Sequence, residues 1–245
     1  MLARYHEVAH AHSQVPLINN HIRLLGEICG LHGGSRLLDL GCGSGQLLSE
    51  WASRFTIMGT GVDESQALIE LARENALAKE IDKRLSFVVD NPQHYPQDFH
   101  AFDVIVSMSS GVLGSGLAEV ITMMRTALKD DGGLLVIGEP FWREKPPEDV
   151  VEALGVSVDV FQTLPEMLDQ FDEAGVELVE MLLPDTEQVD RFESSQWMSV
   201  YRWLKNNLND PDAPTVHDIM VRNRRMYLTY GRRYLGWGVF VLAWG

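Results

Sequence analysis

The chain has 245 residues, 45% of them apolar, which is enough to bury one large core. Its formal net charge of −15, from 35 acidic and 20 basic residues, would repel a polyanion, so the composition argues against a nucleic-acid substrate. No stretch approaches about 18 consecutive apolar residues, the first residues lack the apolar core of a signal peptide, and only two cysteines occur, so we expect no membrane partner and a cytoplasmic location.

Residues 1–35 form a predicted N-terminal helical cap, because apolar side chains recur at roughly helical spacing in its second half. Gly33–Gly34 then breaks the chain before the first strand. Within the cap, residues 6–10 (His-Glu-Val-Ala-His) match the zinc-protease pattern His-Glu-x-x-His. A zinc protease sets that helix deep inside a domain rather than at the start of the chain, so we predict no metal site.

Residues 37–45 (Leu-Leu-Asp-Leu-Gly-Cys-Gly-Ser-Gly) are the most informative stretch. A glycine-rich turn after a buried strand lets the main chain approach a ligand closely. Asp39 lies inside the apolar run, and burying an unpaired carboxylate is costly, so a cationic ligand group is an expected partner. Three interpretations are open: a tight turn without a ligand, a dinucleotide loop, or a loop for another nucleoside. The dinucleotide pattern Gly-x-Gly-x-x-Gly is not met, because its sixth position is Gln46.

Two further acids close the next two predicted strands. A helix is predicted over 46–55, followed by a strand that ends at Asp63, 20 residues beyond Gly43. An acid at that place can accept both hydroxyls of a ribose. The third predicted strand, 85–89, runs into Asp90–Asn91. Either acid alone could merely cap the helix that follows it, but three acids in this order form a constellation.

The rest of the pattern continues the alternation of strands and helices and predicts an α/β sheet that is mostly parallel. Strands are expected at 102–106, 134–138, 176–183 and 236–242, and helices at 117–128 and 163–175. The connection between the last two strands is about 50 residues long and carries two amphipathic helical signals. It predicts a helical insertion at about 185–235.

In its acid, its three glycines and its flanking leucines, the 37–45 stretch closely resembles the first motif of class I (Rossmann-like) S-adenosylmethionine-dependent methyltransferases. Residues 138–143 and 236–240 further resemble a small stand-alone bacterial subgroup. The resemblance implies a seven-stranded, mostly parallel sheet with helices on both faces and an antiparallel last strand. Residues 36–245 would form this methyltransferase domain, with the helical insertion before the last strand.

The resemblance also implies a cofactor, S-adenosylmethionine, with S-adenosylhomocysteine as product. Asp39 would help to hold its ammonium group, Asp63 its ribose hydroxyls, and Asp90 with Asn91 its adenine edge. The other expected cofactor-binding residues approach or flank the ligand: they are Gly41, Gly43, Gly45, Gln46, Glu64 and Met108.

Methyl transfer needs a general base only if the acceptor must lose a proton, and Glu139 is the best-placed candidate because it follows the fifth predicted strand. Its alternative role is an ion pair with Arg143. The expected acceptor is a small molecule. Aromatic and basic residues gather near the insertion, although aromatics at helical spacing often belong to a core. The candidate acceptor-side residues are Trp142, Arg143, Trp197, Tyr201, Arg202, Tyr230 and Trp237.

Two other functions stay open from the sequence alone. The first is an NAD-dependent oxidoreductase, which also binds a ribose with an acid at the end of the second strand, but which the missing third glycine and Asp39 disfavour. The second is a non-catalytic protein that binds S-adenosylmethionine without transferring its methyl group.

Overall fold

The computed structural model describes residues 2–9, 16–95, 100–108, 116–155 and 157–244. The chain forms two compact units. The first, here called the sheet unit, is made of residues 17–139, 165–183 and 238–245, and the second, the helical unit, is made of residues 1–16, 140–164 and 184–237. The two halves of the expected cap, residues 1–16 and 17–35, thus belong to different units.

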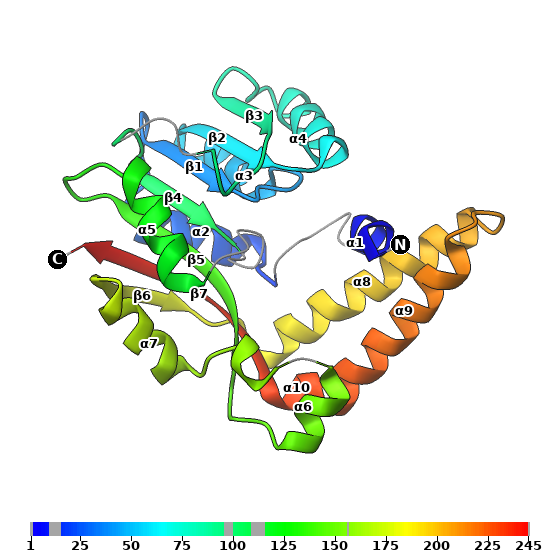
Figure 1. Ribbon diagram of the computed structural model, residues 1–245. Coiled ribbons are helices and arrows are strands. Elements are labelled where there is room, and N and C mark those ends of the chain that lie inside the picture. Colours follow the sequence, from blue (N-terminus) through cyan, green and yellow to red (C-terminus); the bar gives the residue numbers. More distant parts are fainter. Residues whose placement is uncertain (1, 10–15, 96–99, 109–115, 156, 245) are drawn as a thin grey trace. The chain divides into compact units, whose positions relative to one another are not determined.

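One seven-stranded sheet has the strand order β3-β2-β1-β4-β5-β7-β6 (Figure 1). Every described pairing among β1 to β5 is parallel, and β6 pairs antiparallel with β7. This confirms the predicted fold class, including the antiparallel last strand. The strands are β1 (Arg36–Leu40), β2 (Met58–Asp63), β3 (Leu85–Val89), β4 (Val104–Ser107), β5 (Leu134–Trp142), β6 (Val176–Leu182) and β7 (Leu235–Trp244).

The middle strands are apolar because both faces of the sheet are covered, as is usual for parallel sheets. Leu37, Leu38 and Ile105 are fully buried. In Figure 1, α5 lies on the near side of the sheet and α2 on the far side. The indole of Trp51 in α3 is also fully buried and donates a hydrogen bond to the Ile22 carbonyl of α2 (2.7 Å). The helices of this unit are α2 (Asn19–Ile28), α3 (Gln46–Phe55), α4 (Gln66–Ala78), α5 (Leu117–Ala127) and α7 (Leu164–Glu173).

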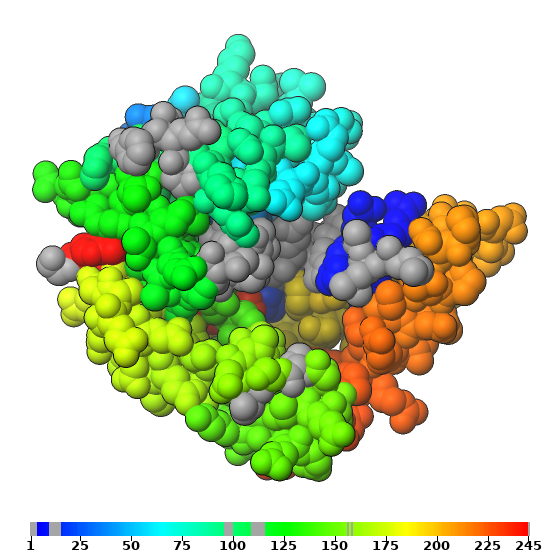
Figure 2. Space-filling view, viewed as in Figure 1, coloured from blue at the N-terminus to red at the C-terminus, as the bar shows by residue number. Residues whose placement is uncertain are grey.

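The helical unit contains the two helices expected from the amphipathic signals. A capping box of Asp185 and Gln188 begins α8, in which each side chain accepts a hydrogen bond from the other residue's main-chain N–H. On Figure 2 these two helices run from yellow to orange. The elements of this unit are α1 (Leu2–Ala9), α6 (Glu148–Leu154), the 3₁₀ turn η2 (Val158–Val160), α8 (Thr186–Asn206), α9 (Ala213–Met226), the π-helical turn η3 (Tyr227–Gly231) and α10 (Arg232–Tyr234).

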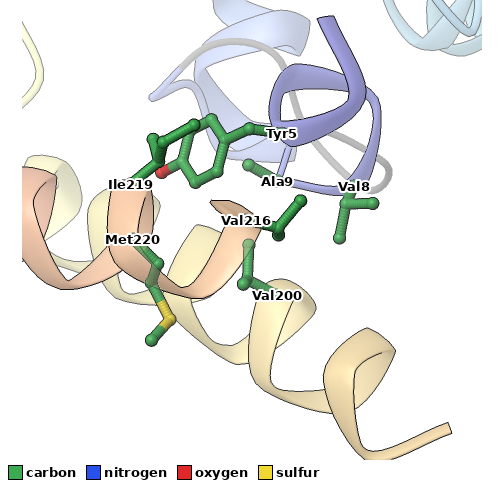
Figure 3. Close-up of a cluster of buried hydrophobic side chains, with 7 residues drawn as sticks. All are labelled: Tyr5, Val8, Ala9, Val200, Val216, Ile219 and Met220. Carbon is green, nitrogen blue, oxygen red and sulfur yellow. The ribbon is translucent and has the colours of Figure 1, made fainter. Parts of the chain in front are cut away.

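A cluster of buried apolar side chains holds α1 on α8 and α9 (Figure 3). In that view Tyr5, Val8 and Ala9 of α1 face Val200 of α8 and three residues of α9. Because Tyr5, Val8 and Ala9 recur at helical spacing on one side of α1, they give this helix an apolar face to bury. The α9 members are Val216, Ile219 and Met220.

Three differences between the structure and the predicted elements bear on the argument. Strand β5 continues to Trp142 instead of ending at residue 138, so Glu139 and Pro140 lie inside it. Strand β4 begins at Val104, and Phe102 makes only an isolated bridge to Leu128. Helix α6 was not predicted. Within the described part of the chain, none of the helices has the length and apolar character that a membrane span requires.

Candidate active site

The carboxyl ends of five neighbouring strands gather most of the predicted cofactor residues, and we call this side of the sheet unit the carboxyl edge. In the order of the sheet, Asp90 follows β3, Asp63 ends β2, and Asp39 lies near the end of β1. Met108 follows β4, and Glu139 lies in β5. Ligands of open α/β sheets bind at this edge. The parallel topology therefore brings together residues that are up to 100 positions apart in the sequence.

The glycine loop between β1 and α3 can turn tightly because its glycines adopt left-handed conformations. Gly41, Gly43 and Gly45 have φ values of 82°, 52° and 70°. A Cβ on Gly45 would come within 2.6 Å of the Phe87 ring, so this position also lacks room for a side chain. Gln46 is the first residue of α3 and is half-buried. The three glycines thus leave stretches of main chain without a side chain, as close approach to a ligand requires.

Asp63 organises this loop through its carboxylate. One oxygen accepts the Gly43 N–H and the other accepts the Ser65 N–H, both at 2.9 Å. A carboxylate accepts about four hydrogen bonds, so both oxygens keep capacity for a ligand. The Ser65 hydroxyl in turn caps α4 by accepting the Leu68 N–H (3.3 Å). Sequence reasoning did not assign Ser65 to the site, although a serine just before a helix is a recognisable N-cap.

Asp39 is a buried carboxyl without a counter-charge. Its residue is 2% exposed, and in the described part of the chain no hydrogen bond or ion pair reaches its side chain. Burial, followed by the negative charge of Asp63, raises the pKa of Asp39 to about 7. A cation bound beside it would compensate this cost. The structure thus places this carboxyl in the buried position from which the sequence argument starts, and its cationic partner stays a prediction.

The third acid lies on the same edge but in a more open place. Asp90 is exposed; its main-chain N–H donates to the Asp63 carbonyl (3.2 Å), and its side chain accepts the Asn91 N–H (2.7 Å). The Asn91 side-chain oxygen accepts the Gln93 N–H (2.8 Å). These bonds fix the turn after β3. Glu64 is also exposed, at the position after Asp63.

Cys42 lies in the middle of the glycine loop and is 8% exposed. Its thiol donates a weak hydrogen bond to the Gly43 carbonyl (3.7 Å). Burial, followed by the charges of Asp39 and Asp63, raises the pKa of the Cys42 thiol far above its ordinary value. The thiol is therefore protonated and acts as a small apolar group in the loop.

Met108 and Glu139 complete the carboxyl edge on β4 and β5. Both are half-buried. Glu139 was expected just after a strand, whereas the structure places it within β5, three residues before the strand ends. The pairing of Ser107 with Ile137 keeps the two strand ends in step.

The acceptor-side candidates all belong to the helical unit, and the structure divides them among different surroundings. The expectation that Trp142 contacts the acceptor is corrected, because this residue is only 1% exposed. It packs with Val150 and Tyr234 and meets the Phe161 ring edge-on at 5.2 Å. Its indole thus belongs to the core of this unit. Tyr230 packs against the same cluster and is half-buried.

The remaining candidates range from packed to open. The Arg143 guanidinium donates to the Leu235 carbonyl (2.9 Å), which ties the end of β5 to the start of β7. Trp197 is half-buried and meets the Tyr227 ring edge-on. Tyr201 and Arg202 are exposed on α8, and Trp237 is half-buried in β7.

The His-Glu-x-x-His stretch falls only partly within the structure. His6 belongs to α1 and meets the Tyr5 ring edge-on at 5.7 Å, whereas His10 lies outside the described residues. Among the residues that the structure describes, no group of three or more His, Cys, Asp or Glu side chains is arranged to hold a metal ion.

The carboxyl edge suits S-adenosylmethionine on its own chemistry. A glycine-rich loop lets a ligand approach its main chain closely, and a cation would compensate the burial of the Asp39 carboxyl. An amino-acid ammonium supplies that charge, whereas a pyrophosphate would bring further negative charge next to Asp39 and Asp63. The electrostatics of this edge therefore disfavour a dinucleotide.

Comparison with known proteins agrees with this chemistry. A family described as a methyltransferase domain matches residues 31–205. Protein YjhP of Escherichia coli (strain K12) is 35% identical over 229 residues, which are 93% of this chain and 92% of YjhP. The 27-O-demethylrifamycin SV methyltransferase of Amycolatopsis mediterranei (strain S699) is 30% identical over 152 residues, 60% of this chain and 56% of that enzyme.

A solved structure is similar over nearly the whole length. It is the crystal structure of a SAM-dependent methyltransferase from Geobacter sulfurreducens in complex with S-adenosyl-L-homocysteine; it has a TM-score of 0.92 and 34% sequence identity, and the match covers 99% of this chain and 98% of that one. The oxidoreductase alternative and the non-catalytic alternative are both set aside by these matches. This chain belongs to the methyltransferase-domain family and is an S-adenosylmethionine-dependent methyltransferase.

Proposed function

We propose that this methyltransferase acts on a small-molecule acceptor in the cytoplasm. The net charge of −15 supports this proposal, because it would repel a nucleic acid. The similar Amycolatopsis enzyme, whose name gives 27-O-demethylrifamycin SV as its substrate, supports it further. The free Cys42 thiol in the glycine loop suits a reducing compartment.

The cofactor contacts that we propose follow the carboxyl edge. Asp39 binds the ammonium group of the cofactor, and Asp63 accepts hydrogen bonds from the two ribose hydroxyls. Asp90 with Asn91 binds the adenine edge. The loop from Gly41 to Gly45, with Gln46, lies against the methionine part, while Glu64 and Met108 flank the ligand. The observation that carries this assignment is the buried Asp39 carboxyl with no counter-charge in the described chain.

When bound, S-adenosylmethionine supplies a methyl group activated by a sulfonium. The residues of this chain then have two tasks, which are to align the acceptor and to exclude water. Alignment alone can lower a barrier by on the order of 7–11 kcal/mol. We propose that Glu139 takes a proton from the acceptor where the reacting group is a hydroxyl or an ammonium. Its half-buried position in β5, on the same edge as the cofactor residues, supports this role.

We further propose that the acceptor is recognised by the helical insertion at about 185–235 within a methyltransferase domain of residues 36–245, with residues 1–35 as its cap. The exposed Tyr201 and Arg202 and the half-buried Trp197, Tyr230 and Trp237 support this, because each keeps surface that a ligand can cover. Arg143 offers a guanidinium for an anionic group, although one of its N–H groups is already used.

A labelling screen tests the acceptor class. The protein is incubated with S-adenosylmethionine carrying an isotopic methyl group and with a bacterial extract divided into metabolites, nucleic acids and proteins. We expect the label in the metabolite fraction, where mass spectrometry identifies the product. Label recovered only in nucleic acid or in protein would overturn the small-molecule proposal.

The Glu139→Gln variant tests the proposed general base. It should lower kcat and remove the dependence of kcat on pH, while the affinity for S-adenosylhomocysteine stays unchanged.

A further inference from the structure

A groove lies at the opposite side of the same sheet, where β1, β2 and β3 begin, and we call this side the amino edge. The groove has a volume of about 220 Å³ and is lined by ten residues. Leu37, Leu85 and Phe102 provide a buried apolar part of that lining. Cofactors of open α/β sheets bind at the carboxyl ends of the strands, so this groove is not the S-adenosylmethionine site.

The charge of the groove is opposite to that of the chain. Its lining contains three basic residues, Arg36, Lys83 and Arg84, and no acidic residue. In the whole chain acids outnumber bases by 35 to 20. Within the described residues no carboxylate forms an ion pair with any of the three basic side chains. Their positive charges are therefore available to a ligand.

Two of these cations are held in place by neutral groups. The Arg36 guanidinium carbon lies 5.6 Å from the centre of the Phe102 ring, a cation–π contact that leaves the N–H donors open. The Arg84 guanidinium donates one N–H to the Ala52 carbonyl, and a guanidinium has five donors in all. Lys83, in the turn before β3, is exposed.

The charge of Asp103, an acid that is bonded to the Arg36 main chain at the groove, is already balanced. Asp103 accepts the Arg36 main-chain N–H at 2.8 Å and the Lys129 ammonium at 2.5 Å. Partial burial would raise the pKa of Asp103, but these two hydrogen bonds and the Lys129 charge outweigh it and hold that pKa below its ordinary value. Because Lys129 neutralises Asp103, this acid does not cancel the charge of the three cations.

The spacing of the cations indicates what they would bind. Arg36 begins β1 and Arg84 immediately precedes β3, while β2 lies between these two strands. Neighbouring strands are about 4.8 Å apart, so the two flanks of the groove are separated by about 10 Å of main chain. Between them, Thr60 and Ser86 face each other in register and bring hydroxyl groups into the lining. A ligand that meets both flanks needs two anionic groups.

We propose that the amino-edge groove binds a small polyanion carrying at least two phosphate or carboxylate groups, with Arg36 on one flank and Lys83 and Arg84 on the other. This site is separate from the cofactor site and does not depend on which acceptor the enzyme methylates. Phosphate and carboxylate share the chemistry that such cations recognise, because both are planar or tetrahedral oxyanions that accept several charge-assisted hydrogen bonds.

Isothermal titration calorimetry with magnesium-free pyrophosphate and with citrate tests the proposal. Saturating S-adenosylhomocysteine is present throughout, so the cofactor site is occupied. We expect one site for pyrophosphate or for citrate, and the stronger probe tells the phosphate source from the carboxylate source. For pyrophosphate binding, orthophosphate should bind at least tenfold more weakly, because it cannot span the two flanks. Absence of binding by both probes at millimolar concentration, or equal affinity for orthophosphate and pyrophosphate, would overturn the proposal.

Two matched charge reversals locate the site. Lys83→Glu should weaken binding of the stronger probe at least tenfold. Lys205→Glu changes an exposed lysine in the last turn of α8 by the same charge and should change the affinity by less than twofold. Arg36→Gln provides a second variant on the other flank, with an expected loss of at least fivefold. Equal losses of affinity in Lys83→Glu and Lys205→Glu would show that the probe responds only to the overall charge of the protein. Displacement of the probe by S-adenosylhomocysteine would show that it binds in the cofactor site. Either result would overturn the proposed polyanion site.

Discussion

The two edges of one parallel sheet are built from the same strands and yet differ in charge and in construction. At the carboxyl edge, Asp39, Asp63 and Asp90 stand beside a glycine loop in which the Gly43 N–H is held by the Asp63 carboxylate. At the amino edge, Arg36 and Arg84 bring side-chain charge to a groove with no such loop. The comparison teaches that strand ends rather than average composition decide what each edge can bind. Ligand binding at the carboxyl edge depends on backbone geometry, whereas the proposed binding at the amino edge depends on side-chain charge.

The largest expected effect breaks the backbone geometry of the carboxyl edge. Gly43→Val should weaken S-adenosylhomocysteine binding at least a hundredfold, because valine strongly disfavours the φ of 52° and the Gly43 N–H would leave Asp63. Titration calorimetry measures the affinity and circular dichroism checks the fold. Gly132→Val is the matched control, since Gly132 also has a positive φ, of 73°, and has open space around its Cβ position. If both variants bind the cofactor equally well, the loop is not part of the site.

Removing the carboxylate that holds the loop should come next in size. Asp63→Ala should weaken S-adenosylhomocysteine binding at least tenfold, or about 1.4 kcal/mol, because the Gly43 and Ser65 N–H groups and the proposed ribose contacts all lose their acceptor. Asp103→Ala removes an acid that accepts a main-chain N–H at the amino edge and should leave the affinity unchanged. An unchanged affinity of Asp63→Ala, measured by calorimetry, would contradict the assignment of Asp63.

A pH series sharpens the comparison further by testing whether Asp39 faces a bound cation. The Asp39 carboxyl titrates near pH 7 in the folded protein and near 3.8 when unfolded. Between these two pH values the folded state therefore keeps a proton on Asp39 that the unfolded state has lost. The free energy of unfolding falls as the pH rises through this window. A bound ammonium favours the ionised carboxylate, so cofactor affinity should rise several-fold from pH 5.5 to 7.5 and binding should release a proton.

Asp39→Asn separates these two effects. It should flatten the pH dependence of cofactor affinity and, at pH 8, raise the free energy of unfolding of the ligand-free protein by roughly 2–4 kcal/mol, because no charge is then buried. Calorimetry in buffers with different ionisation heats counts the released protons. Equal proton release by the wild type and by Asp39→Asn would mean that another group titrates.

The smallest expected effect concerns the independence of the two edges. Lys83→Glu should change the affinity for S-adenosylhomocysteine by less than twofold, because Lys83 precedes β3 whereas the cofactor acids stand at the other ends of the strands. Calorimetry in low and in moderate salt measures this. A larger change that persists in moderate salt would show that the two edges are coupled.

The carboxyl edge could be predicted from the sequence because its signals are local. Three glycines at alternate positions and an acid at the end of each apolar run identify the loop, Asp39 and Asp63 without knowledge of the fold. Glu139 was placed only approximately, since Pro140 interrupts the apolar pattern and hides the continuation of β5 to Trp142. The burial of Trp142 was equally hidden, because its core partners Val150 and Tyr234 come from distant segments.

The amino edge could not be predicted for the opposite reason. Arg36 and Lys83 are 47 positions apart, and neither differs in sequence from an ordinary exposed base. Only the strand order β3-β2-β1 brings them to one groove. Helix α6 was not predicted for a different physical reason. It has only seven residues, and the two acids that follow Pro147 are equally typical of a surface loop. Long-range neighbours and short helices carry little periodic signal.

The rate at which the buried Cys42 thiol is chemically modified can report the opening of the glycine loop. A thiol reagent attacks the thiolate, so modification of Cys42 requires that the loop first open to water. The second thiol, Cys29, is half-buried at the end of α2, and burial raises its pKa to about 12. Its modification rate serves as the reference within the same molecule. The ratio of the two rates reports how often the loop opens, and a ligand that closes the loop slows Cys42 alone.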